Sequence, residues 1–270
     1  MKRFFLVVII VSCATGAAAQ ELLSFSDPKT KLYGFKDKKT GKVVAEAAYS
    51  AVSYYNEDMV AVKLNDKWGF INGKGKLVIP MQFDNASGFS EGFGAVGKNI
   101  LSSQGYLDRT EWGFIDRNGK LVIPYKYSTP GVFRNGFAIV SYGTAGFSSL
   151  SGVINKKGQE VVPVKYTALS DRYDGLFKAA TGDVTNYRGK YGFLDSTGKA
   201  VVPLIYDDAM DFSEGLAAVK KDGKYGFINN KGAVVIPFQF DGPTYFEKGK
   251  ASVEKAGVSF YINKKGEKVN

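Results

Sequence analysis

One short phrase recurs along this chain and limits its possible folds more than any other feature. Most copies combine an aromatic residue, Gly and Phe with an Asn/Asp-x-x-Gly segment and a final apolar run. The seven copies are YGFKDKKTGKVV (33–44), WGFINGKGKLVIP (68–80), WGFIDRNGKLVIP (112–124), SGVINKKGQEVVP (151–163), YGFLDSTGKAVVP (191–203), YGFINNKGAVVIP (225–237) and SFYINKKGEKV (259–269). The Gly of the first six copies falls at 34, 69, 113, 152, 192 and 226, giving spacings of 35, 44, 39, 40 and 34 residues. Periods of this length are typical of solenoids, propellers and other repeat arrays.

Each copy predicts a β-hairpin. In the second copy the side chains alternate, with Trp68 and Phe70 toward one face and Gly69 and Ile71 toward the other. The Asn/Asp-x-x-Gly segment predicts a type I turn whose Gly has a positive φ. A second apolar strand follows, and its proline is expected to end it because proline cannot donate to the ladder. These prolines are Pro80, Pro124, Pro163, Pro203 and Pro237.

A second phrase lies between the hairpins and predicts a further strand. Phe-Ser-Glu-Gly at 89–92 and 212–215 varies to FRNG at 133–136 and FEKG at 246–249, a pattern typical of a turn. An apolar run such as Leu216–Val219 comes next, and a tight turn such as Asp222-Gly223 joins it to the following aromatic-Gly strand. The predicted unit is therefore a three-stranded antiparallel meander with a linking segment.

Together the two phrases resemble the WG-repeat, or KWG-repeat, family of bacterial proteins over roughly residues 32–269. The resemblance implies a β-rich repeat scaffold, exported in many cases, with no shared catalytic residues. Copies four and seven depart from the pattern at Ser151-Gly152-Val153 and Ser259-Phe260-Tyr261.

We expect an all-β fold in which about seven meanders stack as an open, curved β-solenoid. A closed β-propeller is the alternative, because four-stranded blades have similar lengths and the segment at Tyr206-Asp207-Asp208 could supply a fourth strand. Variable spacing and atypical terminal copies favour the open stack. Residues 20–270 are expected to form a single WG-repeat domain.

The recurring aromatic-Gly-Phe positions are interpreted as packing elements rather than as ligand platforms, because a position shared by most units is explained by a repeated core. These residues are Trp68, Gly69, Phe70, Trp112, Gly113, Phe114, Tyr191, Gly192, Phe193, Tyr225, Gly226 and Phe227. Tyrosine is expected to be tolerated there because its hydroxyl can reach water.

Residues 1–19 are predicted to be a secretory signal peptide. Lys2 and Arg3 precede an apolar run, Phe4–Val11, that is too short to span a membrane, and small residues follow up to Ala19. We expect cleavage after Ala19 and export to the periplasm, the outer-membrane surface or the medium. Residues 10–13 also resemble a lipobox, so the alternative is a lipoprotein attached to a membrane through Cys13.

Composition limits the chemistry. The chain contains no His and a single Cys, which removes imidazole catalysis, His/Cys zinc sites and an intrachain disulfide. Without Lys2 and Arg3 it keeps 34 basic and 26 acidic residues, a net charge of +8. Because an exported protein rarely meets nucleic acid, we interpret this excess as a solvated lysine-rich surface.

The acidic residues recur with the repeat. Asp84, Asp207 and Asp241 follow an aromatic residue, and Glu91 and Glu214 precede a Gly. A glycosidase needs one pair of carboxylates, so a set present in many units indicates turn-forming roles. No copy has the ligand density of a calcium loop. We therefore expect no enzyme activity, metal or cofactor, with a carbohydrate-active hydrolase as the alternative.

Three neighbouring units enlarge the same hairpin loop, at residues 99–110, 142–151 and 181–188. Equivalent loops of successive repeats often carry partner contacts. The leading hypothesis is an exported, non-enzymatic scaffold that binds a protein, or a cell-envelope glycan, there; a purely structural envelope component is a further alternative. The expected contact residues are Tyr106, Arg109, Tyr142, Phe147, Tyr187 and Arg188.

Overall fold

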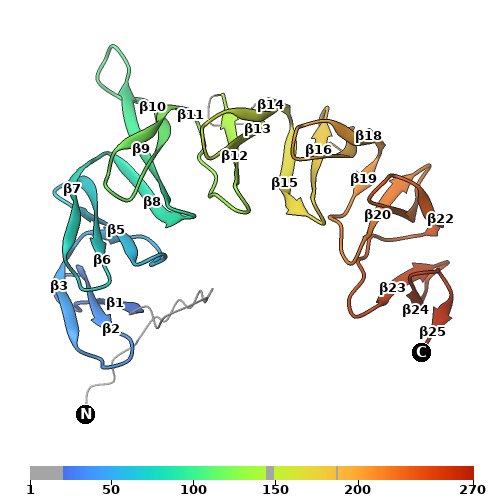
Figure 1. Cartoon of the computed structure of the whole chain (residues 1–270), viewed down its shortest axis with the longest axis horizontal. Coiled ribbons are helices and arrows are strands. Elements are labelled where there is room, and N and C mark those ends of the chain that lie inside the picture. Colours follow the sequence, from blue (N-terminus) through green and yellow to red (C-terminus); the bar gives the residue numbers. More distant parts are fainter. Residues whose placement is uncertain (1–20, 144–148, 187) are drawn as a thin grey trace. The chain divides into compact units, whose positions relative to one another are not determined.

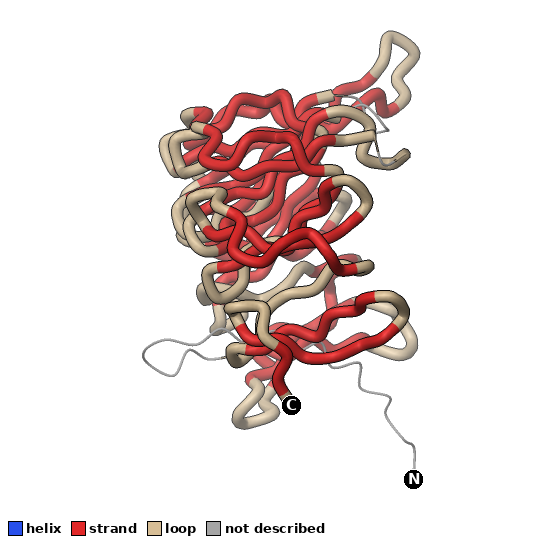
Figure 2. The backbone as a smooth tube through the Cα atoms, turned by 90° about the vertical axis from the view of Figure 1, so that its right-hand side faces the viewer, coloured by secondary structure: helices blue, strands red, loops and turns tan. Residues whose placement is uncertain are grey.

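The computed structural model describes residues 21–143, 149–186 and 188–270. The expected signal peptide with Cys13, and the side chains of Phe147 and Tyr187, lie outside these residues. All regular structure in the described part is β-strand, which confirms the all-β prediction (Figures 1 and 2). No helix there is long and apolar enough to cross a membrane. The strands fall into two compact units, one ending at Phe133 and the other running from Arg134 to Asn270.

The first unit contains three antiparallel sheets in sequence order. The first sheet consists of β1 (Leu22–Ser26), β2 (Tyr33–Asp37) and β3 (Val43–Tyr49). The second consists of β4 (Ala51–Val52), β5 (Met59–Leu64), β6 (Lys67–Asn72) and β7 (Leu77–Phe83). The third consists of β8 (Asn85–Ser90), β9 (Phe93–Leu101), β10 (Leu107–Ile115) and β11 (Leu121–Tyr127).

The second unit contains four antiparallel sheets of the same kind. They consist of β12 (Phe137–Tyr142), β13 (Leu150–Asn155) and β14 (Glu160–Tyr166); β15 (Ala168–Tyr173), β16 (Leu176–Thr181), β17 (Lys190–Leu194) and β18 (Ala200–Tyr206); β19 (Asp208–Ala209), β20 (Leu216–Lys221), β21 (Lys224–Asn229) and β22 (Val234–Phe240); and β23 (Lys250–Lys255), β24 (Val258–Asn263) and β25 (Lys268–Val269).

The tandem meanders are thus confirmed, and four sheets have one strand more than predicted. In these sheets the linking segment pairs with the strand that follows it, as β4, β8, β15 and β19. β8 reads NASGFS, and Asn, Ser and Gly have little intrinsic preference for strands, so its strand character depends on its partner β9.

The prediction that proline ends the second strand is wrong. β7 continues through Pro80 to Phe83, and the equivalent strands pass their own prolines in the same way. Phe70 pairs with Ile79 while Trp68 pairs with Phe83, so β7 is bulged at the proline. β7 is also an edge strand, the place in a sheet where proline is tolerated because one side of the strand has no partner.

The predicted turns are confirmed. The Gly75 amide donates to the Asn72 carbonyl at 2.9 Å, and Gly75 has a φ of +75°. The Phe-Ser-Glu-Gly turn is a different, two-residue type: Glu91 and Gly92 both have positive φ, at 51° and 86°, as a type I′ turn requires.

Consecutive sheets of a unit are joined by packing rather than by strand pairing. Phe70 of β6 meets Phe89 of β8 at a ring-centroid distance of 5.1 Å, and Phe227 of β21 meets Phe246 at 5.0 Å, both edge to face. The equivalent pairs are Phe114 with Phe133, at 5.1 Å, and Phe193 with Phe212, at 4.6 Å. Each of these four hairpins therefore buries its Phe against the linking segment of the next repeat.

One junction of the second unit is built differently. Val153 of β13 stands where β17 and β21 have Phe, and Arg172 of β15 stands where the next linking segment has Phe. The Arg172 guanidinium instead lies over the Phe137 ring, 5.3 Å from its centroid, and Phe137 packs edge to face on Phe177 at 5.6 Å. Both members of the aromatic pair are replaced together.

Candidate functional site

The aromatic-Gly-Phe strands form the core of the repeats. Phe70, Phe114, Phe193 and Phe227 are buried, as are the glycines before them, whereas Trp68, Trp112 and Tyr191 are half-buried. Tyr225 is also buried, and its hydroxyl donates to the Asp208 carboxylate at 2.6 Å. Burial, together with this bond, raises the pKa of Tyr225. The sequence had predicted that this hydroxyl reaches water, and it reaches a carboxylate instead.

Each position of the Phe-Ser-Glu-Gly phrase has a contact across a repeat junction. The Phe packs on the preceding repeat, as described above. The second residue donates to the backbone of the next repeat: Ser90 Oγ to the Phe133 carbonyl at 2.6 Å, and Ser213 Oγ to the Phe246 carbonyl at 2.7 Å. The phrase is therefore a two-sided connector between neighbouring repeats.

The acidic residue of each of these connectors accepts a hydrogen bond from the backbone of the next connector. Glu214 Oε2 accepts the Gly249 amide at 3.0 Å, and Glu57 Oε2 accepts the Gly92 amide at 2.8 Å. Asp174 Oδ2 accepts the Gly215 amide at 2.7 Å in the same way. The bond from Lys264, with that of Gly249, holds the pKa of Glu214 below its usual range.

A second set of carboxylates follows the bulged strand and binds the Lys that precedes the aromatic-Gly dipeptide. Lys67 Nζ lies 2.5 Å from Asp84 Oδ1, and Lys190 Nζ lies 2.5 Å from Asp207 Oδ1. Asp84 also accepts the Asn99 amide of the next sheet at 2.8 Å. The Lys67 bond and this amide keep the pKa of Asp84 below its usual range. Asp241 binds Lys224 and the Ala256 amide in the same manner.

These contacts give the recurring carboxylates structural roles. Asp84, Asp207 and Asp241 each bind a lysine, and Asp84, Asp241 and Glu214 each accept a backbone amide. Among the described residues, no group of three or more Asp, Glu, His or Cys side chains could hold a metal ion.

The β9–β10 hairpin is the enlarged loop that the structure describes in full. Its pairing extends from Lys98 and Glu111 out to Leu101 and Leu107, and in Figure 1 the loop projects beyond the strands of its sheet. The stem is fixed at Asn99, whose Oδ1 accepts the Thr110 hydroxyl at 3.0 Å and the Asn85 amide at 2.8 Å.

The tip of this hairpin is apolar and exposed. Tyr106 is 74% exposed, and Leu101 and Leu107 are each 60% exposed. Arg109 lies lower on β10, where its guanidinium is 2.7 Å from Asp108 and 2.8 Å from Glu111. The expected contact residues of this loop thus separate into an exposed ring at the tip and a cation neutralised on the stem.

The other two enlarged loops belong to the second unit. Tyr142 ends β12, and its hydroxyl lies 3.3 Å from Glu160 Oε1. In the loop before β17 the Arg188 amide donates to the Asp183 carbonyl at 2.8 Å, and Asp183 also binds Thr185 and Asn186. Asp183 is the centre of these bonds, and it was not among the expected contact residues.

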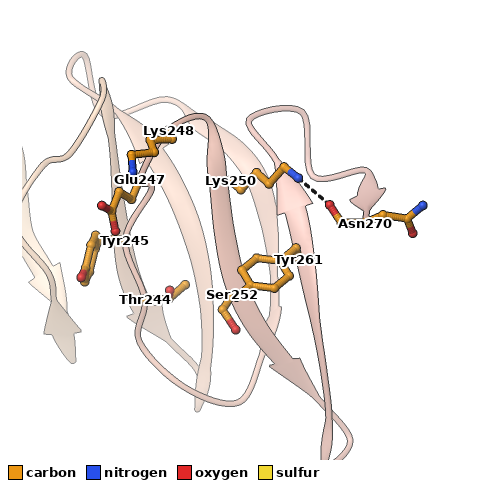
Figure 3. A pocket seen from close by; sticks show the side chains of 8 residues that line it. All are labelled: Thr244, Tyr245, Glu247, Lys248, Lys250, Ser252, Tyr261 and Asn270. Atoms are coloured by element: carbon orange, nitrogen blue, oxygen red, sulfur yellow. Dashed lines mark hydrogen bonds between the residues drawn. The ribbon is translucent and has the colours of Figure 1, made fainter.

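A pocket of about 680 Å³ lies on the last sheet of the second unit (Figure 3). It is lined by Thr244, Tyr245, Glu247, Lys248, Lys250, Ser252, Tyr261 and Asn270. None of these residues was expected to take part in binding, because the seventh copy was interpreted only as a departure from the repeat.

The model of the WG containing repeat matches residues 33–68, 68–99, 112–143, 152–182, 191–225 and 225–258. The chain belongs to the WG-repeat family. Its six matched WG repeats cover the connectors and the aromatic-Gly-Phe positions described above. No curated protein matches the chain.

Several solved structures resemble the WG-repeat chain distantly. Pyrococcus horikoshii acylaminoacyl peptidase is 11% identical, with a TM-score of 0.41 over 86% of this chain and 46% of the peptidase. Citrobacter koseri AztD is 12% identical, with a TM-score of 0.39 over 92% of this chain and 78% of AztD. The β-propeller domain of the Trilobed protease from Pyrococcus furiosus is 10% identical, with a TM-score of 0.39 over 92% of this chain and 90% of that domain. This chain spans about half the length of the acylaminoacyl peptidase. TM-scores this low support no conclusion about the activity of the WG-repeat chain.

The WG-repeat sequence contained a signal for the residues that were missed. The polar Ser-Ser-Gln-Gly turn is flanked by large apolar residues, Leu101 on one side and Tyr106 with Leu107 on the other. Lys248 and Tyr261 stand in place of Glu214 and Phe227 of the preceding repeat, which an alignment of the copies makes visible.

Proposed function

We propose that this WG-repeat protein is an exported scaffold that acts by binding a protein partner, rather than by catalysis, through the tip of its β9–β10 hairpin. The observation that carries the proposal is the exposure of Leu101, Tyr106 and Leu107 together at the tip. Large apolar side chains that contribute nothing to a core are characteristic of interaction sites, and aromatic residues are enriched among those that contribute most to affinity.

The stem supports such a role because it holds the tip in place before any partner binds. Asn99 bonds to Thr110, Asn85 and the Asp84 carboxylate, which fixes the hairpin to its own sheet and to the preceding one. A contact surface on a preorganised element loses less conformational entropy on binding. Tyr106 and Arg109 were the expected contact residues of this loop. Of the two, Tyr106 is expected to contribute most of the binding energy, together with Leu101 and Leu107.

Serine at positions 101, 106 and 107 together is expected to weaken partner binding at least about tenfold while leaving the fold intact, since all three side chains are exposed. The measurement is photo-crosslinking in the native host from a reactive residue at position 106, followed by affinity measurements with the captured protein. The matched control is position 54, because Tyr54 is 65% exposed in the same unit but lies outside the hairpin. Equal capture from positions 54 and 106, or unchanged affinity of the triple variant, would rule out the tip as the binding site.

Export is supported by the positive, apolar and small-residue segments of residues 1–19. Intact-mass measurement of the protein from its host is expected to give a chain that starts at Gln20. An acylated start at Cys13 would replace this with the lipoprotein alternative, and a chain retaining Met1 to Ala19 would contradict export.

A further inference from the structure

The pocket on the last sheet occupies the place of a repeat junction. In the preceding repeat, Phe227, Leu216, Ala218 and Ile236 are buried together and pack against Phe246 of the following linking segment. The residues at the same repeat positions in the last sheet all differ: Tyr261, Lys250, Ser252 and Asn270. All four line the pocket.

The connector of the last repeat also has different polar residues from the connector before it. Glu247 stands where Ser213 bonds to the next repeat, and Lys248 stands where Glu214 accepts the next Gly amide. Both residues also line the pocket. At all six compared positions, the residue of the preceding repeat is therefore replaced here by a different residue with a polar group.

The first sheet of the first unit also differs from other repeats at a junction position, but by a single charged residue. Lys36 stands where Ile71 and Ile228 are fully buried against the preceding repeat. Lys36 lies over the Phe25 ring, 4.8 Å from its centroid, and covers it with charge. The last sheet instead keeps two aromatic rings exposed, Tyr245 at 55% and Tyr261 at 52%.

The arrangement of these groups fits a ring-shaped, hydroxylated ligand. Figure 3 shows Tyr245 on one side of the pocket, Tyr261 and Ser252 on the other, and Thr244 between them. Within the described part of the chain, the hydroxyls of these four residues have no hydrogen-bond partner, whereas Lys250 donates to the Asn270 carbonyl at 2.5 Å. Aromatic faces can cover the C–H face of a pyranose while hydroxyl and amide groups bond to its edge. The volume of about 680 Å³ is in the range of small-molecule sites.

From this geometry we propose that the last sheet binds a saccharide between Tyr245 and Tyr261. The site is separate from the β9–β10 tip, so it does not depend on the proposed function. The charged residues of the pocket are Lys248, Lys250 and Glu247. Lys250 already donates to Asn270, which leaves one lysine and one glutamate, so neutral sugars are the expected ligands.

The test uses the full chain and three neutral probes: the trisaccharides of N-acetylglucosamine, of α-1,4-linked glucose and of β-1,4-linked glucose. Ligand-observed NMR at probe concentrations up to about 10 mM detects dissociation constants in the millimolar range and below. At least one probe is expected to bind, and Tyr261→Ala is expected to weaken it at least about tenfold. Tyr261→Phe, which keeps the ring, is expected to retain most of the affinity.

Tyr173→Ala is the matched control, because Tyr173 is 48% exposed in the same unit but does not line the pocket. It is expected to leave binding unchanged. Absence of binding by all three probes would overturn the proposal, as would equal affinities of the Tyr261→Ala and Tyr173→Ala variants. Neither result would affect the hairpin tip, whose partner is measured separately.

Discussion

Phe227→Ala is expected to lower the free energy of unfolding of the last two sheets by about 3–5 kcal/mol, the usual cost of removing a buried Phe ring. Phe227 is 1% exposed and contacts both Phe246 at 5.0 Å and Phe240 at 6.2 Å. The Phe246 contact joins β21 to the final repeat, so the loss falls on the junction as well as on the hairpin. Because a repeat array can unfold in parts, the measurement is hydrogen exchange of β20–β25 alongside denaturant unfolding.

Tyr261→Ala is the matched control for this effect. Tyr261 has the same repeat position as Phe227, but it is 52% exposed and faces the pocket rather than another repeat. Its removal is expected to cost less than about 1 kcal/mol, as is usual for exposed positions. Equal losses in the two variants would contradict the conclusion that this position stabilises the fold only where a successor covers it.

Gly226→Ala is expected to destabilise the β21–β22 hairpin by about 3 kcal/mol, at the upper end of the cost of overpacking. A Cβ at Gly226 would lie 2.7 Å from the Ile236 carbonyl oxygen, 2.9 Å from the Phe238 nitrogen and 3.0 Å from the Pro237 carbonyl carbon. All three atoms are backbone atoms of β22, so relief requires movement of the whole strand. Thermal and denaturant unfolding of the variant measure the loss.

Gly242→Ala provides the control with the opposite sign. No atom lies within 4 Å of a Cβ at Gly242, and its φ is not in the positive range. Alanine there is expected to be neutral or to stabilise by up to about 1 kcal/mol, because it restricts the unfolded chain. A similar destabilisation at both glycines would show that the aromatic-Gly dipeptide does not require Gly for close approach of the strands.

The sequence predicted the features that depend on local residue order. Alternation in Trp68–Asn72 specifies a strand, and the Asn72-x-x-Gly75 spacing specifies its turn, because side-chain alternation and positive φ are local properties. The repeat period and the buried Phe of each hairpin follow from the same short segments. These elements could be placed before any contact between repeats was known.

Features that depend on pairing between segments could not be predicted in this way. Pro80 looked like a strand end because its missing donor is visible in the sequence, whereas the bulge that accommodates it depends on the register with β6. The acceptance of the Gly92 amide by Glu57 joins residues 35 positions apart, and only the packing of neighbouring sheets brings them together.

The same distinction between local and long-range features applies to the two candidate sites. Tyr106 could be selected because an aromatic residue in a polar insertion is a local anomaly. The pocket could not, because Lys250 and Asn270 are ordinary surface residues until their positions are compared with Leu216 and Ile236, which are buried one repeat earlier.

The exceptional junction of Val153 and Arg172 has a consequence for how such a chain can be rearranged. Modules that present Phe and receive Phe have matching ends, so they could be duplicated, deleted or reordered within an engineered chain. The module ending at β14 has Val153 at the Phe position, and the one beginning at β15 has Arg172 at the other, where its guanidinium lies over Phe137 of the preceding module. Those two modules are compatible with each other and mismatched to the rest, so any viable shuffling of the chain has to move them as a pair.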